Sequence, residues 1–448
     1  MIVRGRAHLR TWYVVLFSLY FYYKSSGIFF LLILATSIFD YLLSLKLASC
    51  AKEWQRKLCV ALSVVASLSI LGYFKYANLF VLSWAQLVGS NFQPMDIILP
   101  VGISFYTFQA ISHTVEVYHR RLRLKMDFLE YLFYISFFPL LLSGPITRPS
   151  TMLQQMREDE EVNPRLIYTG LWLVMMGVLK KCVVADYLAQ FNNWAFESPE
   201  LYTGFELMMA TVGFGMQIYC DFSGYSDMSI GIAAMMGFRL RENFNFPYQS
   251  LNPTEFWRRW HMSLSTWFKE YVYIPLGGNR NGLLKQYRNI AIVWLLTGFW
   301  HGANWNYILW GVYFGIILML EKTFLLKVLS KIPKVFSHIY ALFLIGIGWL
   351  IFFFTDMSLG WSIFTSMFGG GGAVFTTATV NYDILRNLLL LAICAIGSTP
   401  YPKKLYYYLA NRFKAFEYAS PVFTCGSFLM CTAYMVDSTF SPFLYYIF

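Results

Sequence analysis

Hydrophobic residues fill this chain in long, nearly uncharged blocks. A helix of about 18 or more such residues is long enough to cross the ~30 Å hydrocarbon core of a bilayer. Candidate spans lie near residues 11–23, 27–45, 58–80, 98–118, 128–147, 166–190, 204–220, 225–238, 288–300, 304–320, 336–355, 383–397 and 418–436. Several are too short to cross alone, so we predict roughly 10–11 transmembrane helices, with the shorter blocks re-entrant or interfacial.

The strands of a membrane barrel alternate apolar and polar residues, whereas these blocks are apolar throughout. The sequence therefore predicts an all-α polytopic membrane protein, in which residues 1–448 form a single membrane domain. The first block follows three arginines (4, 6 and 10) and has no small-residue cleavage site behind it. We interpret it as a retained first membrane segment rather than a signal peptide.

Composition agrees with this prediction. Apolar residues make up 57% of the chain and charged residues only 13%, and the mean hydropathy is +0.49. Soluble domains carry about 25% charged residues. The net charge of +11 comes from short basic clusters, which we place at cytoplasmic ends of spans. Examples are Lys180–Lys181, Lys322–Lys334 and Lys403–Lys404. This distribution indicates membrane lipids, and not nucleic acid, as the partner of the basic residues.

The chain offers little for metal binding. Its seven cysteines include no C-x-x-C pair, which argues against a zinc site or a disulfide framework. In HTVEVYH (113–119), the two histidines are six residues apart and lie off a common helical face. We therefore predict no metal site, and we interpret this stretch as the end of an interfacial helix.

The segment 239–288 is too charged to span and too aromatic for a free loop, a combination typical of the membrane interface. Within it, FWRRWHMSLSTWFKEY is predicted to be one helix with a polar and basic stripe. The residues of that stripe are Trp257, Arg258, His261, Ser265 and Lys269, with Arg259 beside it. Such a stripe suits a channel for a phosphate-bearing thioester carrier, and equally suits anchoring to anionic lipid head groups.

His301 lies between two apolar runs in WLLTGFWHGANWNYILWG (294–311). Thr297 and Asn304 are predicted to share its helical face and to orient its ring, and Trp300 precedes it. Gly298 and Gly302 form a small-x-x-x-small pair that lets another helix approach closely. Ionisable groups at membrane depth are costly, so we favour a functional histidine that takes a proton from a hydroxyl over a structural one.

A third polar cluster, YCDFSGYSDMS (219–229), contains Asp221, Ser223, Tyr225 and Asp227. Its carboxylates suit a proton relay, or ion pairs with Arg258 or Arg259. We favour structural pairing near the site, because unpaired carboxylates are expensive to desolvate.

Together these stretches resemble the membrane-bound O-acyltransferase family, most closely its bacterial alginate-acetylating branch. The matching motifs are LPVGISFYTFQAISH (99–113), SFFPLLLSGPITRP (136–149), YCDFSGYSDMSIGIAAMMGFRLRENFNFPY (219–248), EFWRRWHMSLSTWFKEYVYIPLGGNR (255–280) and LLTGFWHGANWNYILWG (295–311). They cover a core of about 99–311 in order. Two departures from the family pattern stand out. The family pattern has one further N-terminal span before the point where this sequence begins, so we expect either a missing first helix or a shifted start site. Leu140 replaces an expected glutamine.

The resemblance implies tilted helices around a central pore, with His301 as the essential histidine and His261 as the second characteristic one. It implies transfer of an acetyl group from a cytoplasmic thioester donor, either acetyl-coenzyme A or a phosphopantetheine carrier, with no permanently bound cofactor. The acceptor would be an exported polysaccharide, reached through an extracytoplasmic partner of the SGNH hydrolase-like class. An acyl-carrier protein is a second expected partner, and the bacterial cytoplasmic membrane is the expected location.

Two alternatives stay open. One is a D-alanyl transferase of the teichoic-acid type that draws on a carrier protein, to which the same basic stripe is suited. The other is a transporter or channel whose polar residues line a pore. Transporter folds are commonly built from internal repeats, and none is visible in this sequence.

Overall fold

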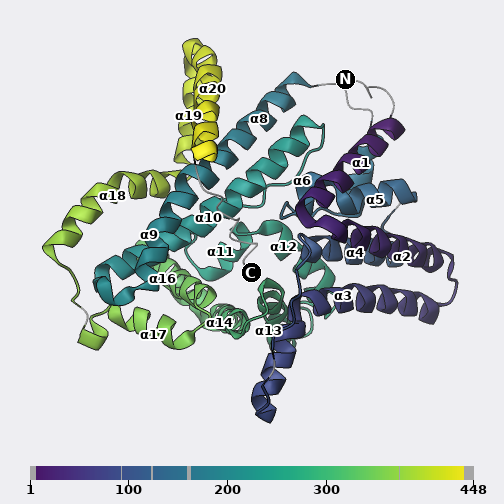
Figure 1. Cartoon of the computed structure of the whole chain (residues 1–448), viewed down its shortest axis with the longest axis horizontal. Coiled ribbons are helices and arrows are strands. Elements are labelled where there is room, and N and C mark those ends of the chain that lie inside the picture. The colour runs from purple at the N-terminus through teal and green to yellow at the C-terminus, as the bar shows by residue number, and fades with distance from the viewer. Residues whose placement is uncertain (1–6, 92, 123–124, 159–162, 373, 438–448) are drawn as a thin grey trace. The chain divides into compact units, whose positions relative to one another are not determined.

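The computed structural model describes residues 7–91, 93–122, 125–158, 163–372 and 374–437, and helices dominate it (Figure 1). No strand occurs within these ranges. The prediction of an all-α membrane protein is confirmed.

The chain divides into two compact units, residues 1–171 with 229–241 and residues 172–228 with 242–448. Both the helix α8 (Pro164–Val178) and the helix α10 (Gly204–Met235) contribute residues to the two units. The other helices of the first unit are α1 (Ala7–Ser26), η1 (Gly27–Phe29), α2 (Phe30–Ser49), α3 (Glu53–Val88), α4 (Ile103–Tyr118), α5 (Phe128–Ser136), α6 (Phe138–Leu141) and α7 (Pro149–Arg157).

The second unit holds the helices that form the candidate site. Its first half contains η2 (Leu179–Ala185), α9 (Asp186–Glu197), η3 (Pro199–Leu201), η4 (Pro247–Gln249), α11 (Pro253–Arg259), α12 (Met262–Phe268), η5 (Lys269–Tyr273), α13 (Leu283–His301) and α14 (Trp305–Leu320). Its second half contains η6 (Glu321–Leu325), α15 (Leu326–Leu329), α16 (Lys334–Phe353), α17 (Met357–Ser366), η7 (Gly370–Gly372), α18 (Ala378–Gly397), α19 (Tyr401–Arg412) and α20 (Lys414–Asp437).

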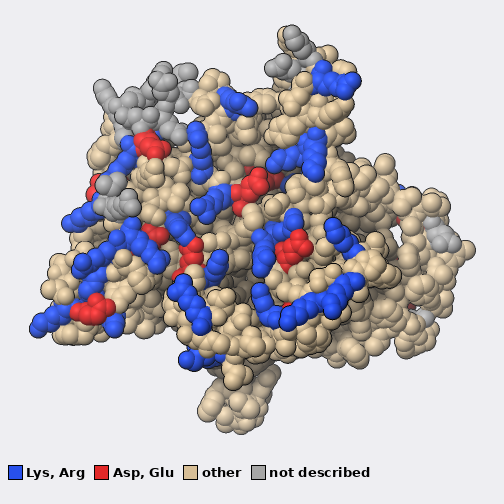
Figure 2. Space-filling view, turned by 180° about the vertical axis from the view of Figure 1, so that it is seen from behind, with Lys and Arg blue, Asp and Glu red and all other residues tan. Residues whose placement is uncertain are grey.

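Five helical stretches among the described residues are long and apolar enough to cross a membrane: His8–Ser49, Glu53–Val88, Pro164–Glu197, Lys334–Phe353 and Ala378–Gly397. Many large apolar side chains on them are exposed, among them Leu87 and Leu389. Charged side chains lie in separate groups on a mostly uncharged surface, and Lys and Arg cover more of the visible face than Asp and Glu (Figure 2). Exposed apolar surface on this scale is stable against lipid and not against water.

Two predicted spans are joined and one is divided. Residues 204–220 and 225–238 were expected as separate spans, but α10 runs unbroken from Gly204 to Met235, and its aspartates Asp221 and Asp227 pair with lysines of η2. The block 128–147 breaks into α5 and α6 at Phe137, just before Pro139. A proline removes a helix hydrogen bond and clashes with the preceding turn.

The first unit has a polar interior at the middle of α2. Asp40 is buried, and its carboxylate accepts a hydrogen bond from the Ser63 hydroxyl of α3 at 2.8 Å. Ser63 lies 3.0 Å from the Thr114 hydroxyl of α4. Hydroxyl groups of α3 thus satisfy the carboxylate directly, and Thr114 of α4 extends the network through Ser63.

Candidate active site

The segment FWRRWHMSLSTWFKEY, which was predicted to be one continuous helix, is broken into two short helices. α11 begins with Asn252 as its N-cap, whose side chain accepts from the Glu255 amide at 2.8 Å, and ends at Arg259. His261 then adopts a left-handed conformation (φ 43°, ψ 55°), and α12 begins at Met262. A left-handed backbone is strained for a residue with a side chain, and such strain clusters at functional sites.

Backbone hydrogen bonds to residues outside this segment stabilise the break. The Asn245 amide donates to the Arg259 carbonyl at 2.9 Å, and the Met262 amide donates to the Asn243 carbonyl at 2.9 Å. In a continuous helix, the Arg259 carbonyl and the Met262 amide would instead form hydrogen bonds within that helix. The local sequence has no proline or glycine here, so the spacing of its aromatic residues could not reveal the break.

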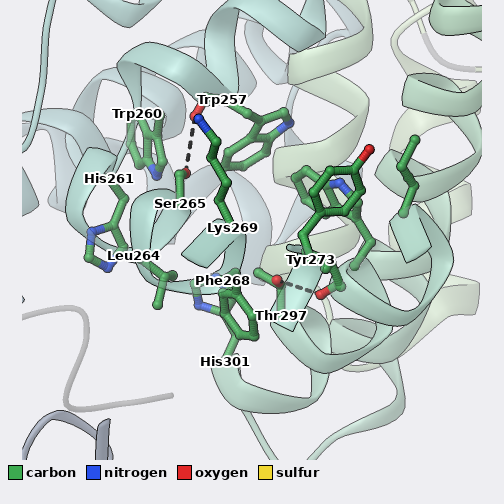
Figure 3. A pocket seen from close by; sticks show the side chains of 13 residues that line it. Trp257, Trp260, His261, Leu264, Ser265, Phe268, Lys269, Tyr273, Thr297 and His301 are labelled. Carbon is green, nitrogen blue, oxygen red and sulfur yellow. Dashed lines mark hydrogen bonds between the residues drawn. The ribbon is translucent and has the colours of Figure 1, made fainter. Parts of the chain in front are cut away.

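The broken segment forms one wall of a cavity of about 190 Å³, and α13 forms the other. Figure 3 shows side chains of α11, α12 and η5 gathered opposite Thr297 and His301 of α13. The α13 face that lines it runs from Ile290 to His301, three turns of helix or about 16 Å. The lining is mainly aromatic and aliphatic, as is typical of small-molecule sites.

His301 is the last residue of α13 and lies at the deep end of this face, only 6% exposed. Aromatic rings surround it: the ring centroids of Trp300 and Trp310 are each 4.9 Å from its own, and that of Phe352 is 5.3 Å away. The imidazole is thus fixed by packing from three helices, α13, α14 and α16, while it still borders the cavity.

Two glycines bring α13 and α14 together below this histidine. A Cβ on Gly298 would lie 2.3 Å from the Tyr307 carbonyl oxygen, and a Cβ on Gly311 would lie 2.4 Å from the Trp294 carbonyl oxygen. A Cβ on Gly302 would collide with the Tyr307 ring. The predicted close helix approach is confirmed, with α14 as the partner.

His261 is buried on the opposite wall. Its Nδ1 lies 3.2 Å from the Asn243 side-chain oxygen, and the Phe222 ring packs edge-on against it at 4.7 Å between centroids. The short helices α11 and α12 lie outside the spanning helices, and burial lowers the pKa of His261 to about 3. The ring is therefore uncharged at neutral pH, because burial disfavours the imidazolium.

Six of the predicted site residues line the cavity together: His261, His301, Trp257, Ser265, Lys269 and Thr297. Lys269 is exposed, so its ammonium group is available to solvent at the edge of the cavity. The Ser265 hydroxyl donates to the Trp257 carbonyl at 3.1 Å and the Thr297 hydroxyl to the Val293 carbonyl at 2.7 Å (Figure 3).

Four of the predicted residues lie elsewhere. Arg258 is exposed, and Arg259 pairs with Glu255 at 2.8 Å; neither lines the cavity. Trp300 packs between the two histidine rings, at 6.1 Å from His261, without lining the cavity. The prediction that Asn304 shares the helical face of His301 is wrong, because α13 ends at His301 and Asn304 is the exposed N-cap residue of α14.

The aspartates of the third cluster pair with lysines and not with Arg258 or Arg259. Lys181 lies 2.8 Å from carboxylate oxygens of Asp221 and Asp186, and Lys180 lies 2.6 Å from Asp227. Neither these aspartates nor Ser223 and Tyr225 line the cavity. Lys180 and Lys181, which were predicted to mark a cytoplasmic end, lie in the π-helix η2 within the apolar helical stretch Pro164–Glu197. The structural interpretation of this cluster fits its geometry.

Seven further residues that line the cavity were not predicted from the sequence. Trp260, Leu264, Phe268, Tyr273, Ile290, Val293 and Trp294 also line the cavity. The α13 residues among them follow the spacing of Thr297 and His301, which was a usable signal. Asn243 was missed as well, although it is a polar residue in the aromatic run ENFNFPY.

Comparison with known proteins decides the family. The sequence pattern of the membrane-bound O-acyltransferase family matches residues 113–364, more than half of the chain. The chain belongs to the membrane-bound O-acyltransferase family. This membership establishes an O-acyltransferase, and with the apolar helices a multi-pass membrane protein, which disfavours the transporter alternative.

Individual relatives of this O-acyltransferase agree with the family assignment. Probable alginate O-acetylase AlgI of Azotobacter vinelandii is 36% identical over 372 residues, which cover 81% of this chain and 74% of that protein. The peptidoglycan O-acetyltransferase of Helicobacter pylori is 33% identical over 389 residues, with 80% and 74% covered. The teichoic acid D-alanyltransferase of Bacillus subtilis is 29% identical over 237 residues, with 50% and 59% covered.

Proposed function

We propose that this O-acyltransferase moves an acetyl group from a cytoplasmic thioester donor across the membrane to an acceptor hydroxyl, toward O-acetylation of an exported polysaccharide, with His301 as the base. The observation that carries the proposal is the single cavity bordered by both His261 and His301. Relatives named for alginate and peptidoglycan O-acetylation favour acetyl as the group and a polysaccharide as the acceptor.

The basic residues near the hairpin of α13 and α14 support a cytoplasmic donor. Lys285 and Arg288 lie in the first turns of α13, and Lys322 follows α14. By the positive-inside rule, both open ends of the hairpin face the cytoplasm. α13 is 19 residues long, about 28 Å, so His301 lies far from that side. A donor would enter near Lys269 and Ile290 and place its thioester near His301.

The chemistry needs no covalent intermediate on the protein. His301 takes the proton of the acceptor hydroxyl as its oxygen attacks the thioester carbonyl carbon. The carbon–sulfur bond then breaks, and the departing thiolate receives the proton from His301. The cavity contributes by excluding water, which would otherwise hydrolyse the thioester. Lys269 would pair with a phosphate of either acetyl-coenzyme A or a phosphopantetheine carrier.

We further propose the bacterial cytoplasmic membrane as the location. An acyl-carrier protein on the inner side and an SGNH hydrolase-like acetyltransferase on the outer side are the proposed partners.

Mass analysis of the surface polysaccharide tests this function. A deletion strain carrying the wild-type gene should regain O-acetyl esters, and the same strain carrying His301→Ala should not, at equal protein levels in the membrane. The D-alanyl alternative is favoured by the teichoic acid relatives. If the wild-type gene restores D-alanyl esters and leaves acetyl content unchanged, that alternative replaces the acetyl proposal.

A further inference from the structure

The hydrogen bonds around Asn243 determine which nitrogen of His261 carries its proton. The side-chain oxygen of Asn243 lies 3.1 Å from the Ser263 amide nitrogen, 2.9 Å from the Ser263 hydroxyl and 3.2 Å from Nδ1 of His261. A backbone N–H can only donate, so the atom that it faces is the amide oxygen, an acceptor. Nδ1 of His261 must therefore be the protonated nitrogen, and Nε2 carries a free lone pair.

That lone pair has no hydrogen-bond donor among the described residues. Nε2 is buried with no partner, and the ring borders the cavity. A buried acceptor without a donor is unfavourable, so such a group marks a place for a ligand or an ordered water. The strained backbone of His261 and the Met262–Asn243 bond hold the ring in this position at a cost in conformational energy.

The same surroundings disfavour proton transfer by His261. To act as a base its ring must become charged, and the ring lies buried against Phe222 and Trp300, with no carboxylate paired to it in the part of the chain that the structure describes. The depressed pKa of His261 agrees with this. An uncharged acceptor is suited to binding a neutral N–H group.

We propose that Nε2 of His261 accepts a hydrogen bond from an amide N–H of the pantetheine arm of the donor, and that Asn243 is the positioning residue that fixes this tautomer. The inference rests on the proposed function and assigns His261 to donor binding, with proton transfer left to His301. Acyl-pantetheine carries two amide N–H groups between its phosphate and its thioester. The cavity, with Lys269 at its edge and His301 about three turns of α13 beyond Ile290, places His261 alongside such an arm.

The experiment compares donors and variants of the full chain in everted membrane vesicles. The probes are acetyl-coenzyme A and an analogue in which the amide nearer the thioester is N-methylated. Thiol release gives kcat and KM, and binding of coenzyme A is measured separately as Kd. For the wild type we expect the N-methyl analogue to have a KM at least ten-fold higher than acetyl-coenzyme A, with kcat within three-fold.

His261→Ala should raise the KM for acetyl-coenzyme A about ten-fold and should no longer distinguish the two donors. His261→Gln, whose amide oxygen can accept the same hydrogen bond, should recover much of the KM. Asn243→Asp keeps an acceptor for Nδ1 but adds a negative charge that favours imidazolium. Its kcat/KM should therefore fall on the acid side and recover at higher pH, a change in the pH profile that a purely structural role would not produce.

The inference is overturned if His261→Ala lowers kcat with KM unchanged, as expected for a base, or if it discriminates between the two donors as strongly as the wild type. A wild type that binds coenzyme A and releases no thiol overturns the proposed function instead. In that case the Kd values of the wild type, His261→Ala and His261→Gln still decide the binding role.

Discussion

His113 and His261 are buried to the same degree, each 2% exposed, and each has one ring nitrogen without a hydrogen-bond partner among the described residues. His113 lies in α4 of the first unit, with its ring 4.6 Å from that of Tyr131. The cavity near it, lined by Asp40 and Tyr131 among others, is about 10 Å³, room for one water. His261 borders about 190 Å³. Both histidines are thus buried and lack one hydrogen-bond partner among the described residues. They differ in the volume of the neighbouring cavity, and this volume distinguishes a candidate site.

The strongest test makes the same substitution at two buried histidines. We expect His301→Phe to lower kcat by about 10²–10⁴-fold, the usual contribution of a general base. His113→Phe should leave kcat within three-fold, because replacing a buried polar ring by an apolar ring of similar shape is nearly neutral. Thiol release in vesicles measures both. Equal losses at the two positions would contradict the distinction between them.

The second test fills each cavity. Ser265→Phe should block the larger cavity and raise the donor KM by more than ten-fold, with little change in thermal stability, because the cavity has room for the ring. Ala110→Leu, in the wall of the smaller cavity, should instead cost about 1–3 kcal/mol of stability through overpacking and leave KM unchanged. Thermal unfolding in detergent and donor kinetics separate the two effects. A KM change in Ala110→Leu would argue for a donor path through the first unit.

The third test uses pH. The unfolded imidazole has a pKa near 6.5, and the pKa of His261 in the folded protein is about 3. Between these values the unfolded chain binds more protons, so stability falls as the pH is lowered through this window. From pH 6.5 to 5 the loss is about 2 kcal/mol at ~1.4 kcal/mol per unit. His261→Gln should lose less stability than the wild type over this range. If the stability of the wild type and of His261→Gln fell equally over this pH range, protonation of His261 would carry no free-energy cost in the folded protein.

The smallest effect is expected at the edge of the larger cavity. Lys269→Gln should raise the KM for acetyl-coenzyme A about three- to ten-fold through loss of a charge-assisted contact with a phosphate. Arg258→Gln provides the matched control, since this arginine is exposed on the preceding helix and does not line the cavity. Donor kinetics at low and high salt check the result, because a phosphate contact weakens with ionic strength. An equal effect of both substitutions would indicate a diffuse charge effect.

The sequence predicted the fold class, the two cavity histidines and the close approach at Gly298, because apolar blocks and small-residue spacing are local signals. It did not predict the break before His261, because that break depends on Asn243 and Asn245, about 15 residues upstream. It also misplaced the partners of Asp221 and Asp227. Their lysines lie about 40 residues earlier, and only the packing of α10 against η2 brings them together.

The contact between Gly298 and Gly311 has an evolutionary consequence. Each α-carbon faces a carbonyl oxygen of the opposite helix, and main-chain atoms are present whatever the side chains are. A larger residue at one position therefore cannot be compensated by a smaller one at the other, as happens in ordinary core packing. A side chain at Gly298 or Gly311 would push α13 and α14 apart and displace His301, which is the last residue of α13.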